Sequence, residues 1–318
     1  MAQSMRLVGI DVAKAEVVAS IRSLSQRRTF ETTPAGAAEL VAWLRKHRVG
    51  MAVMEASGGY ERPWAAALRK VEIVVRIVNP KRVRRFAEAA GSLAKNDPID
   101  ADMIAWFAET FPDMPALAHD PDREDLQAKV VARQGLVEMR QQLTNLGEHE
   151  VPAVVRQAYA MVAKILARAL AKLEAAIDTK VEAKPEFGEL AEIIESVPGL
   201  ARHSAAACIA RLPELGLVGS RQIGALLGGA PYDDDSGEHR GVRHIKGGRR
   251  DLRCMLYMAI VGAATQHNPV LKAFYQRLLA KGKPKKVAII ACMRRLIVIL
   301  NTMVARREKW DPAKHAVA

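Results

Sequence analysis

Cysteine is scarce in this sequence, and the few cysteines are widely separated. Only three occur in 318 residues: Cys208, Cys254 and Cys292. This spacing excludes a disulfide framework and matches no zinc-binding motif. A signal peptide and a long uncharged apolar run are also missing, because Arg294 and Arg295 interrupt the apolar residues 287–300. We therefore expect a cytoplasmic protein without a membrane span.

Acidic residues are too few to balance the basic ones, and the formal net charge is +13. Such an excess favours a polyanionic partner, because basic side chains release condensed counterions when they bind phosphates. A membrane surface is the competing interpretation. At 318 residues the chain is long enough for two domains and a sizeable core.

The first third of the chain alternates between apolar strands and amphipathic helices. Strands are predicted at residues 5–11, 16–23, 27–32, 50–55 and 72–78, and helices at 34–47, 60–70, 81–90 and from 98 onward. Three strands followed by alternating helices and strands is the element order of an RNase H-like mixed sheet. The predicted fold class is therefore α/β at the N-terminus, followed by mainly helical structure.

Four acids fall at related places in these elements. Asp11 and Glu55 end the first and fourth strands, and Asp97 and Asp100 stand at the start of a helix. In an RNase H-like sheet these positions converge, and clustered carboxylates repel one another unless a cation neutralises them. Mg²⁺ or Mn²⁺, which prefer oxygen ligands, would be the natural occupant. Two such ions can activate one oxygen and stabilise another in phosphodiester chemistry.

A purely structural interpretation of the same acids stays open. Acids at strand ends are often merely solvated, and Asp97 is also a good helix N-cap with Asp100 at the place of a capping-box partner. Asp102 falls on another face of the helix. The agreement of all four positions with one fold favours a metal site.

The middle of the chain is helical and has few breakers. A connector with prolines, residues 112–123, precedes helical stretches at 124–148 and 154–184. Their apolar stripes suit an antiparallel hairpin packed on its own chain or an intermolecular coiled coil. Both arrangements stay open at this point.

Residues from 190 onward are predicted to be globular and mainly helical. Residues 194–200 resemble the turn of a helix-hairpin-helix module, in which backbone N–H groups face a phosphate, although such turns are common between helices. A helix at 251–264 is expected to turn Cys254 inward.

Ser236 precedes a glycine in a loop that is rich in basic residues. Its hydroxyl can be presented to a phosphate, although the pattern alone favours an ordinary Ser-Gly turn in a basic, solvated loop. His239 and His244 could assist proton transfer or be bystanders, and no Ser-His-Asp hydrolase motif surrounds them. The basic residues predicted to contact nucleic acid are Lys81, Arg82, Arg84, Arg85, Arg240, Arg243, Lys246, Arg249, Arg250 and Arg253.

Taken together, these stretches resemble the IS110 family of insertion-sequence transposases, the bridge-RNA-guided DEDD serine recombinases. The resemblance rests on six short motifs: Gly9-Ile10-Asp11, Met54-Glu55-Ala56-Ser57-Gly58-Gly59-Tyr60, Lys95-Asn96-Asp97-Pro98-Ile99-Asp100-Ala101, Val197-Pro198-Gly199-Leu200, Ser236-Gly237 and Lys246-Gly247-Gly248-Arg249-Arg250-Asp251-Leu252-Arg253. Threonine is more usual at Ser57 and Asn96.

The resemblance implies a RuvC-like domain at residues 1–112, a linker and coiled-coil region at 113–187, and a C-terminal transposase domain at 188–318. It assigns Asp11, Glu55, Asp97 and Asp100 to a metal-binding catalytic set that takes Mg²⁺ or Mn²⁺. Ser236 would be the nucleophile that joins DNA covalently. The implied partners are double-stranded donor and target DNA, a structured guide RNA, and further copies of the chain in a dimer or tetramer.

Three other functions share part of this pattern. A site-specific DNA invertase would carry the same motifs without needing a guide RNA. A RuvC-like junction nuclease would use water activated by metal, and Ser236 would then be dispensable. A catalytically silent nucleic-acid-binding protein would need only the basic charge, but the complete acid set argues against it.

Overall fold

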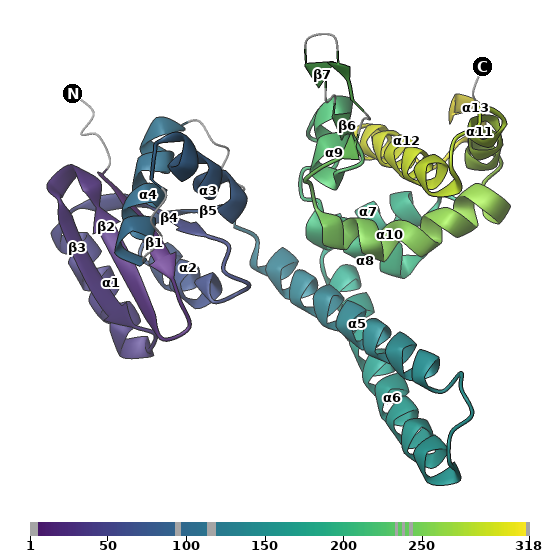
Figure 1. Ribbon diagram of the computed structural model, residues 1–318, viewed down its shortest axis with the longest axis horizontal. Coiled ribbons are helices and arrows are strands. Elements are labelled where there is room, and N and C mark those ends of the chain that lie inside the picture. The colour runs from purple at the N-terminus through teal and green to yellow at the C-terminus, as the bar shows by residue number, and fades with distance from the viewer. Residues whose placement is uncertain are drawn as a thin grey trace. The chain divides into compact units, whose positions relative to one another are not determined.

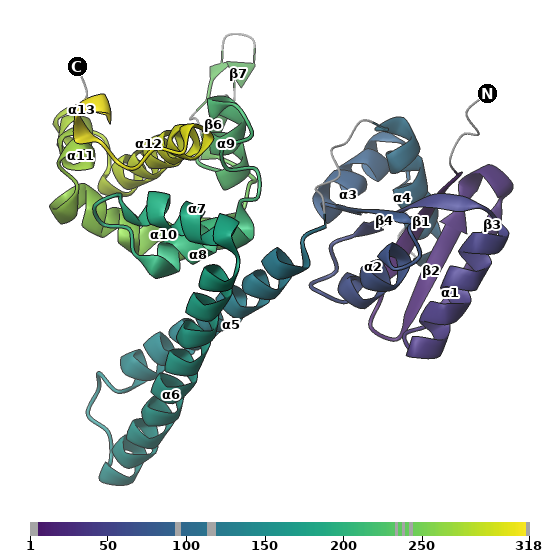
Figure 2. The same ribbon diagram turned by 180° about the vertical axis from the view of Figure 1, so that it is seen from behind.

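The computed structural model describes residues 6–92, 97–112, 119–232, 235–236, 239–241 and 244–315, and of residues 97–99, 235–236 and 239–240 it describes only the backbone. The chain folds into two compact units, Met1–Ala118 and His119–Ala318. Each unit has its own buried core. Figures 1 and 2 show the helices and strands of the two units.

The first unit is built on a five-stranded mixed sheet with the order β3-β2-β1-β4-β5. β1 is parallel to β4, and β4 is parallel to β5, whereas β2 is antiparallel to β1 and β3. The strands are β1 (Arg6–Val12), β2 (Glu16–Ile21), β3 (Gln26–Glu31), β4 (Val49–Glu55) and β5 (Val74–Val78). The sequence predicted all five of these strands, with differences only at their ends.

Helices cover both faces of this sheet (Figure 1). On one face α1 (Pro34–Lys46) and α2 (Glu61–Arg69) enclose the larger core cluster with Trp43 and Trp64. On the other face α3 (Pro80–Ala89) and α4 (Asp97–Thr110) pack around Phe107. Because side chains alternate along a strand, β1 and β4 supply apolar residues to both cores, and β5 does so as well.

Gly9 explains how closely α4 lies on the sheet. A Cβ atom at Gly9 would overlap the backbone oxygen of Ala101 and the backbone nitrogen of Ala105. The helix backbone therefore rests directly on the middle of β1, and only a residue without a side chain fits between them. This contact places the first turns of α4 beside the last residues of β1.

The second unit begins with a long antiparallel helical hairpin of α5 (Pro121–Leu146) and α6 (Ala153–Ala183). The remaining elements are the helices α7 (Pro185–Glu195), α8 (Arg202–Arg211), α9 (Ser220–Leu227), α10 (Arg250–Gly262), α11 (Pro269–Ala280), α12 (Lys285–Arg306) and α13 (Pro312–His315), a π-helical turn η2 (Ala263–His267), and four two-residue strands, β6 to β9. One core cluster joins the root of the hairpin to α7, α8, α10 and α12.

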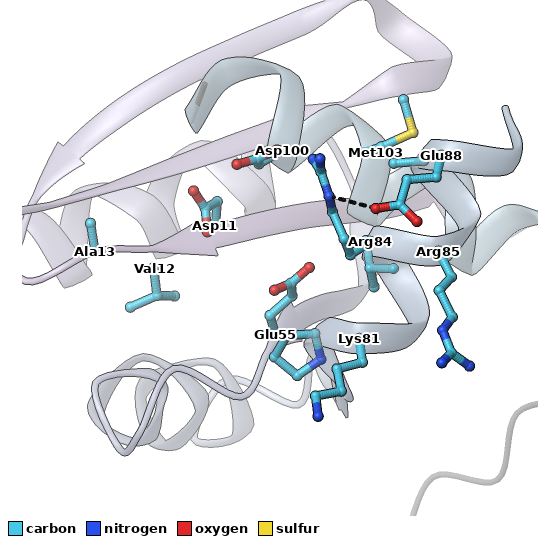
Figure 3. A pocket seen from close by; sticks show the side chains of 13 residues that line it. Asp11, Val12, Ala13, Glu55, Lys81, Arg84, Arg85, Glu88, Asp100 and Met103 are labelled. Atoms are coloured by element: carbon cyan, nitrogen blue, oxygen red, sulfur yellow. Dashed lines mark hydrogen bonds and ion pairs between the residues drawn. The ribbon is translucent and has the colours of Figure 1, made fainter. Parts of the chain in front are cut away.

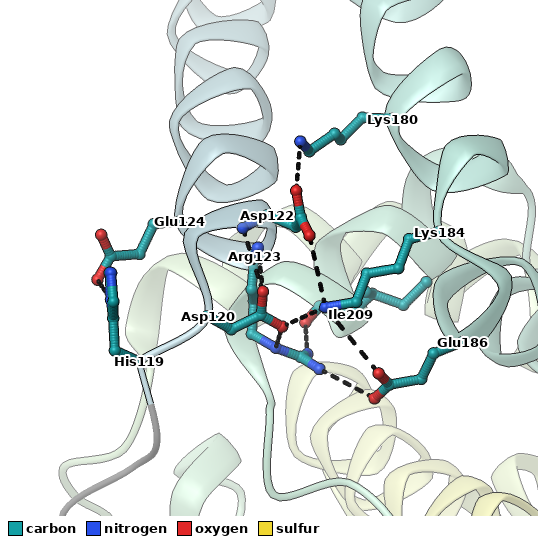
Figure 4. A network of polar contacts seen from close by, with 9 residues as sticks. All are labelled: His119, Asp120, Asp122, Arg123, Glu124, Lys180, Lys184, Glu186 and Ile209. Carbon is teal, nitrogen blue, oxygen red and sulfur yellow. Dashed lines mark hydrogen bonds and ion pairs between the residues drawn. The ribbon is translucent and has the colours of Figure 1, made fainter.

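A network of charged side chains holds the root of the hairpin together (Figure 4). Asp120 caps α5 by accepting hydrogen bonds from the backbone N–H of Asp122 at 3.1 Å and of Arg123 at 3.2 Å. Its other oxygen lies 2.8 Å from the Nζ of Lys184, where α6 meets α7. Arg123 donates a hydrogen bond to the carbonyl of Ile209 in α8. The network thus ties the start of α5 to three other helices.

Cys254 corrects one expectation from the sequence. The buried residues of α10 are Leu252, Leu256 and Ile260, four apart on one face, so Cys254 lies on the exposed side of the helix. The prediction that it turns inward was wrong, because the helical register alone did not show which face meets the core.

Helix α12 is the one element among the described residues that is long and apolar enough to cross a membrane. Half of its most apolar window is buried inside the protein, and core helices often share this composition. Arg294 and Arg295 lie within it, and Leu296 and Leu300 belong to the core.

Candidate active site and ribbon

Asp11 and Glu55 lie at the same edge and on the same face of the sheet. β1 and β4 are parallel neighbours, and Ile10 is paired with Met54, so the next residues along the two strands are Asp11 and Glu55. Asp11 follows Gly9 by two residues and therefore points to the face that α4 covers. The register of two buried strands brings these acids together although 43 residues separate them in the sequence.

Asp100 joins them from the first turns of α4. Asp11, Glu55 and Asp100 line one pocket of about 510 Å³, and Figure 3 shows the three carboxylates around it. The side chain of Asp97, the fourth predicted acid, lies outside the described part of the chain. The prediction that Asp97 caps the helix therefore also lies outside the described residues.

Basic side chains from α3 form another wall of this pocket. Lys81, Arg84 and Arg85 line it, and Arg84 extends between Asp100 and Glu88 in Figure 3. The Nε of Arg84 lies 3.1 Å from a carboxylate oxygen of Glu88. A pocket with acids on the sheet and cations on the adjacent helix suits a bound phosphate with its counter-ions.

Carboxylate oxygens are the ligands that Mg²⁺ and Mn²⁺ prefer, so the donor chemistry of this pocket fits either ion. Within the described side chains, no group of three or more acids, histidines or cysteines is close enough to form a coordination shell. This statement does not include Asp97.

Glu61 organises the loop that follows Glu55, and sequence reasoning missed it. One of its carboxylate oxygens accepts hydrogen bonds from the Ser57 N–H at 3.0 Å, the Ser57 hydroxyl at 3.0 Å and the Gly59 N–H at 2.8 Å. Burial raises the pKa of Glu61, but hydrogen bonds from its own backbone N–H, from Gly59 and from Ser57 outweigh burial and hold the pKa below the usual value of a glutamate. Gly58 has φ +73° and Gly59 has φ +112°, which favours glycine at both positions. The sequence pattern that could have indicated this role is an acid at the start of a helix, shortly after a Gly-Gly turn.

Ser236 lies on a narrow ribbon of two short antiparallel strand pairs in the second unit. One pair is β6 (Pro231–Tyr232) with β9 (His244–Ile245), and the other, nested between them in the sequence, is β7 (Asp235–Ser236) with β8 (His239–Arg240). Ser236 is the direct partner of His239 across this second pair. The side chains of both residues, like residues 237–238, lie outside the description.

The segment that follows the ribbon fastens it to the helical core. Arg249 makes two hydrogen bonds to Glu214, at 2.8 and 2.7 Å, and Arg253 donates to the carbonyls of Leu227 at 2.8 Å and Gly247 at 2.9 Å. Two of the basic residues predicted to contact nucleic acid therefore also have partners within the protein.

The other predicted basic residues with described side chains are exposed. Lys246 and Arg250 lie beside the ribbon, and Arg82, also exposed, lies 5.5 Å from the ring centroid of Phe107. The side chains of Arg240 and Arg243 are not among those described.

The turn at residues 194–200 joins α7 to α8, as predicted, but part of it is used inside the protein. The N–H groups of Val197 and Leu200 donate hydrogen bonds within the turn. Gly199, at φ +96°, lies against Ala263, where a Cβ would overlap. The phosphate-binding role of this turn stays a prediction.

Two family models and two characterised relatives match this chain. A model of the DEDD transposases of the IS110 type matches residues 8–149, and a model described as the IS116/IS110/IS902 transposase family matches residues 191–276. The chain is also similar to the pilin gene-inverting protein of Moraxella lacunata, 24% identical over 329 residues, which cover 98% of this chain and 99% of that protein. The pilin gene-inverting protein of Moraxella bovis is 23% identical over 322 residues, with the same coverage of 98% and 99%. The chain therefore belongs to the IS110 family of transposases, which act on DNA in recombination.

Proposed function

We propose that this transposase cuts and rejoins DNA strands with the four acids as its metal site and Ser236 as its nucleophile. The observation that carries the proposal is the meeting of Asp11, Glu55 and Asp100 at one pocket, beside cations from α3. We further propose that the first unit is a RuvC-like domain. Its strand order and its single antiparallel partner for β1 support this, since both match the predicted RNase H-like sheet.

Asp11, Glu55, Asp97 and Asp100 would hold Mg²⁺ or Mn²⁺ in this proposal. A bound ion would supply Lewis-acid activation and neutralise charge that develops on the phosphate. Lys81, Arg84 and Arg85 would bind and orient the DNA backbone at the same pocket. The pocket would therefore neutralise negative charge from two sides.

In the proposed first step, the Oγ of Ser236 attacks a DNA phosphorus atom and forms a Ser–O–P bond. One bridging P–O bond of the DNA breaks, the hydroxyl proton leaves Oγ, and the departing DNA oxygen takes up a proton. Attack by a different DNA hydroxyl reverses this exchange and rejoins the strands. Because the bond energy is kept in the phosphoserine diester, no nucleotide cofactor is needed.

We propose that donor DNA, target DNA and a structured guide RNA are bound by the exposed basic residues. Among the basic side chains that the structure describes in the second unit, Lys246 and Arg250 are better placed than Arg249 and Arg253, which already hold the ribbon. Changing Lys246 and Arg250 to glutamine should lower the salt dependence of binding by about two released counterions. Lys46→Gln with Lys70→Gln, exposed on the far face of the sheet from the pocket, is the matched control.

The helical hairpin is proposed to join copies of the chain. The hairpin exposes several large apolar side chains along its length: Val131, Met139, Leu146, Val154, Met161, Val162 and Ile165. A second copy would bury this surface, which is long enough for a four-helix contact. Ile165→Glu should shift the sedimentation coefficient toward the monomer, whereas Leu217→Glu, at an 81% exposed site elsewhere in the unit, should not.

We also propose that the chain has three functional domains, residues 1–112, 113–187 and 188–318, and that the hairpin in the middle domain joins copies of the chain. A cytoplasmic location, where DNA is accessible, belongs to the same proposal.

A denaturing gel tests the covalent step. Protein, Mg²⁺, DNA and candidate guide RNA are incubated, denatured and separated, with and without protease. Slow-migrating DNA that protease releases is the expected product, and Ser236→Ala should abolish it while DNA binding persists. Cleaved DNA without an adduct, unaffected by Ser236→Ala, would instead identify a RuvC-like nuclease that uses water.

A site-specific DNA invertase is the second candidate, and the names of the two Moraxella proteins favour it. A plasmid with two inverted copies of a candidate site distinguishes the two functions. Inversion without added RNA would support an invertase, whereas strand exchange only with the guide RNA would support a guided transposase.

A further inference from the structure

We propose that Asp102 is a positioning residue for the acidic site. Together with Ser20 and Arg22 it forms the α4 clamp, which fixes the N-terminal half of α4 on the sheet. This inference rests on the proposed metal site. The motif that contains the predicted acids gives Asp102 no role.

Both carboxylate oxygens of Asp102 face residues of β2 and the turn after it. The Ser20 hydroxyl donates a hydrogen bond to Oδ1 at 3.1 Å, and the Nε of Arg22 lies 3.6 Å from Oδ2. Ser20 is only 3% exposed. A buried hydroxyl needs an acceptor, so this contact resists any shift of the helix.

Arg22 extends the clamp along one face of α4. Its guanidinium carbon lies 4.7 Å from the ring centroid of Trp106, and its NH1 lies 3.1 Å from a carboxylate oxygen of Glu109. Asp102, Trp106 and Glu109 are four and three residues apart, which places them on the same side of the helix. One arginine therefore contacts two successive turns of α4.

The clamp acts next to the place where α4 touches β1. Ser20 is the direct cross-strand partner of Gly9, on which the backbone of Ala101 and Ala105 rests. Asp100 precedes Asp102 by two residues in the same rigid helix and points to the pocket instead. The ligands of a metal site must be held within about 0.5 Å of their productive positions. A shift of α4 would move Asp100 away from Asp11 and so disturb the site.

A variant of Arg22 can show whether this residue affects metal binding through the position of α4 or only through its own positive charge. Removing a cation near an acidic pocket strengthens metal binding if Arg22 acts only through its charge. If Arg22 holds α4 in place, the same change weakens metal binding. The two explanations predict opposite signs for one variant.

The test is Mn²⁺ binding by isothermal titration calorimetry to the full-length chain without nucleic acid. Arg22→Gln and Asp102→Ala should bind Mn²⁺ about threefold to tenfold more weakly than the wild type. Asp102→Asn should lose about twofold or less, because its amide oxygen still accepts from Ser20. Arg28→Gln is the matched control: Arg28 pairs with Glu39 at 2.8 Å and lies 5.0 Å from the Phe30 ring, with neither contact on α4.

Asp11→Asn, which should abolish the titration, shows that the measurement reports on this site. If the wild type binds Mn²⁺ but Arg22→Gln binds equally or more tightly, the clamp is overturned and the metal site stands. Equal losses in Asp102→Asn and Asp102→Ala would make the charge of Asp102 the cause and also overturn the clamp. Absence of Mn²⁺ binding by the wild type would overturn the metal site and the clamp with it. Thermal melts identify unfolded variants, and Arg22→Gln, which is partly exposed, carries the test if Asp102→Ala does not fold.

Discussion

Glu61 gives a sharp test of how the loop after Glu55 is held. Its carboxylate accepts three hydrogen bonds from Ser57 and Gly59, and the residue is only 7% exposed. Replacing it by alanine removes the acceptor and leaves two backbone N–H groups without a partner. Glu61→Gln retains an oxygen in the same place and removes only the charge, so it is the matched control.

The expected magnitude follows from these contacts. An unsatisfied buried donor costs about 1–3 kcal/mol, and partial hydration of the opened loop reduces the sum, so Glu61→Ala should cost about 2 kcal/mol locally. Since 1.4 kcal/mol is a factor of ten, the amides of residues 55–62 should exchange hydrogen about 30-fold faster. Glu61→Gln should lose about 1 kcal/mol, or about fivefold in exchange rate.

The pH dependence has a definite sign. The pKa of Glu61 is lower in the folded chain than in the unfolded chain. The carboxylate therefore contributes stability that is fully present above pH 4.5. That contribution is lost as the pH falls through the lower, folded value. Glu61→Gln should therefore lose less stability than the wild type between pH 7 and pH 3.

Hydrogen exchange with mass spectrometry, corrected for intrinsic rates, measures the opening of peptide 55–62 directly. Peptides from β3, at the opposite edge of the sheet from β4 and β5, provide an internal reference. Exchange in Glu61→Ala within twofold of the wild type would refute the argument that these hydrogen bonds hold the loop.

Two further predictions follow from packing and burial. Gly9→Ala should destabilise the first unit by about 1–3 kcal/mol, because the new Cβ would overlap the backbone of α4. Gly135→Ala is the control, because no atom lies within 4 Å of its new Cβ, and it should be neutral or stabilising. Thermal melts measure both effects. A thiol reagent should label Cys254 in the native protein and all three cysteines after denaturation, since burial raises the pKa of Cys208 to about 12 and that of Cys292 to about 11. Fast native labelling of Cys208 would contradict the described core.

The sheet and the meeting of its acids could be predicted because their signals are local and periodic. Buried strands alternate with helices at short spacing, and an acid is the penultimate residue of β1 and the last residue of β4. Once the topology is assumed, parallel pairing places Asp11 beside Glu55. The metal itself and the role of Ser236 stay predictions.

Contacts between distant residues could not be predicted in the same way. Nothing near Arg249 in the sequence indicates that its guanidinium pairs with Glu214, 35 residues earlier. The same holds for Ser20 and Asp102, which are 82 residues apart. A charge that is paired inside the fold and a charge that faces solvent have the same sequence signal, so composition overestimates the basic surface.

The network at the root of the hairpin has a mechanical consequence. Any force that the first unit exerts on the second through the chain, whatever their orientation, arrives near Asp120. Lys184 holds this residue at 2.8 Å, and Arg123, three residues later, is bonded to α8. Tension is therefore passed to the junction of α6 and α7 and to α8 before it can unwind the first turn of α5.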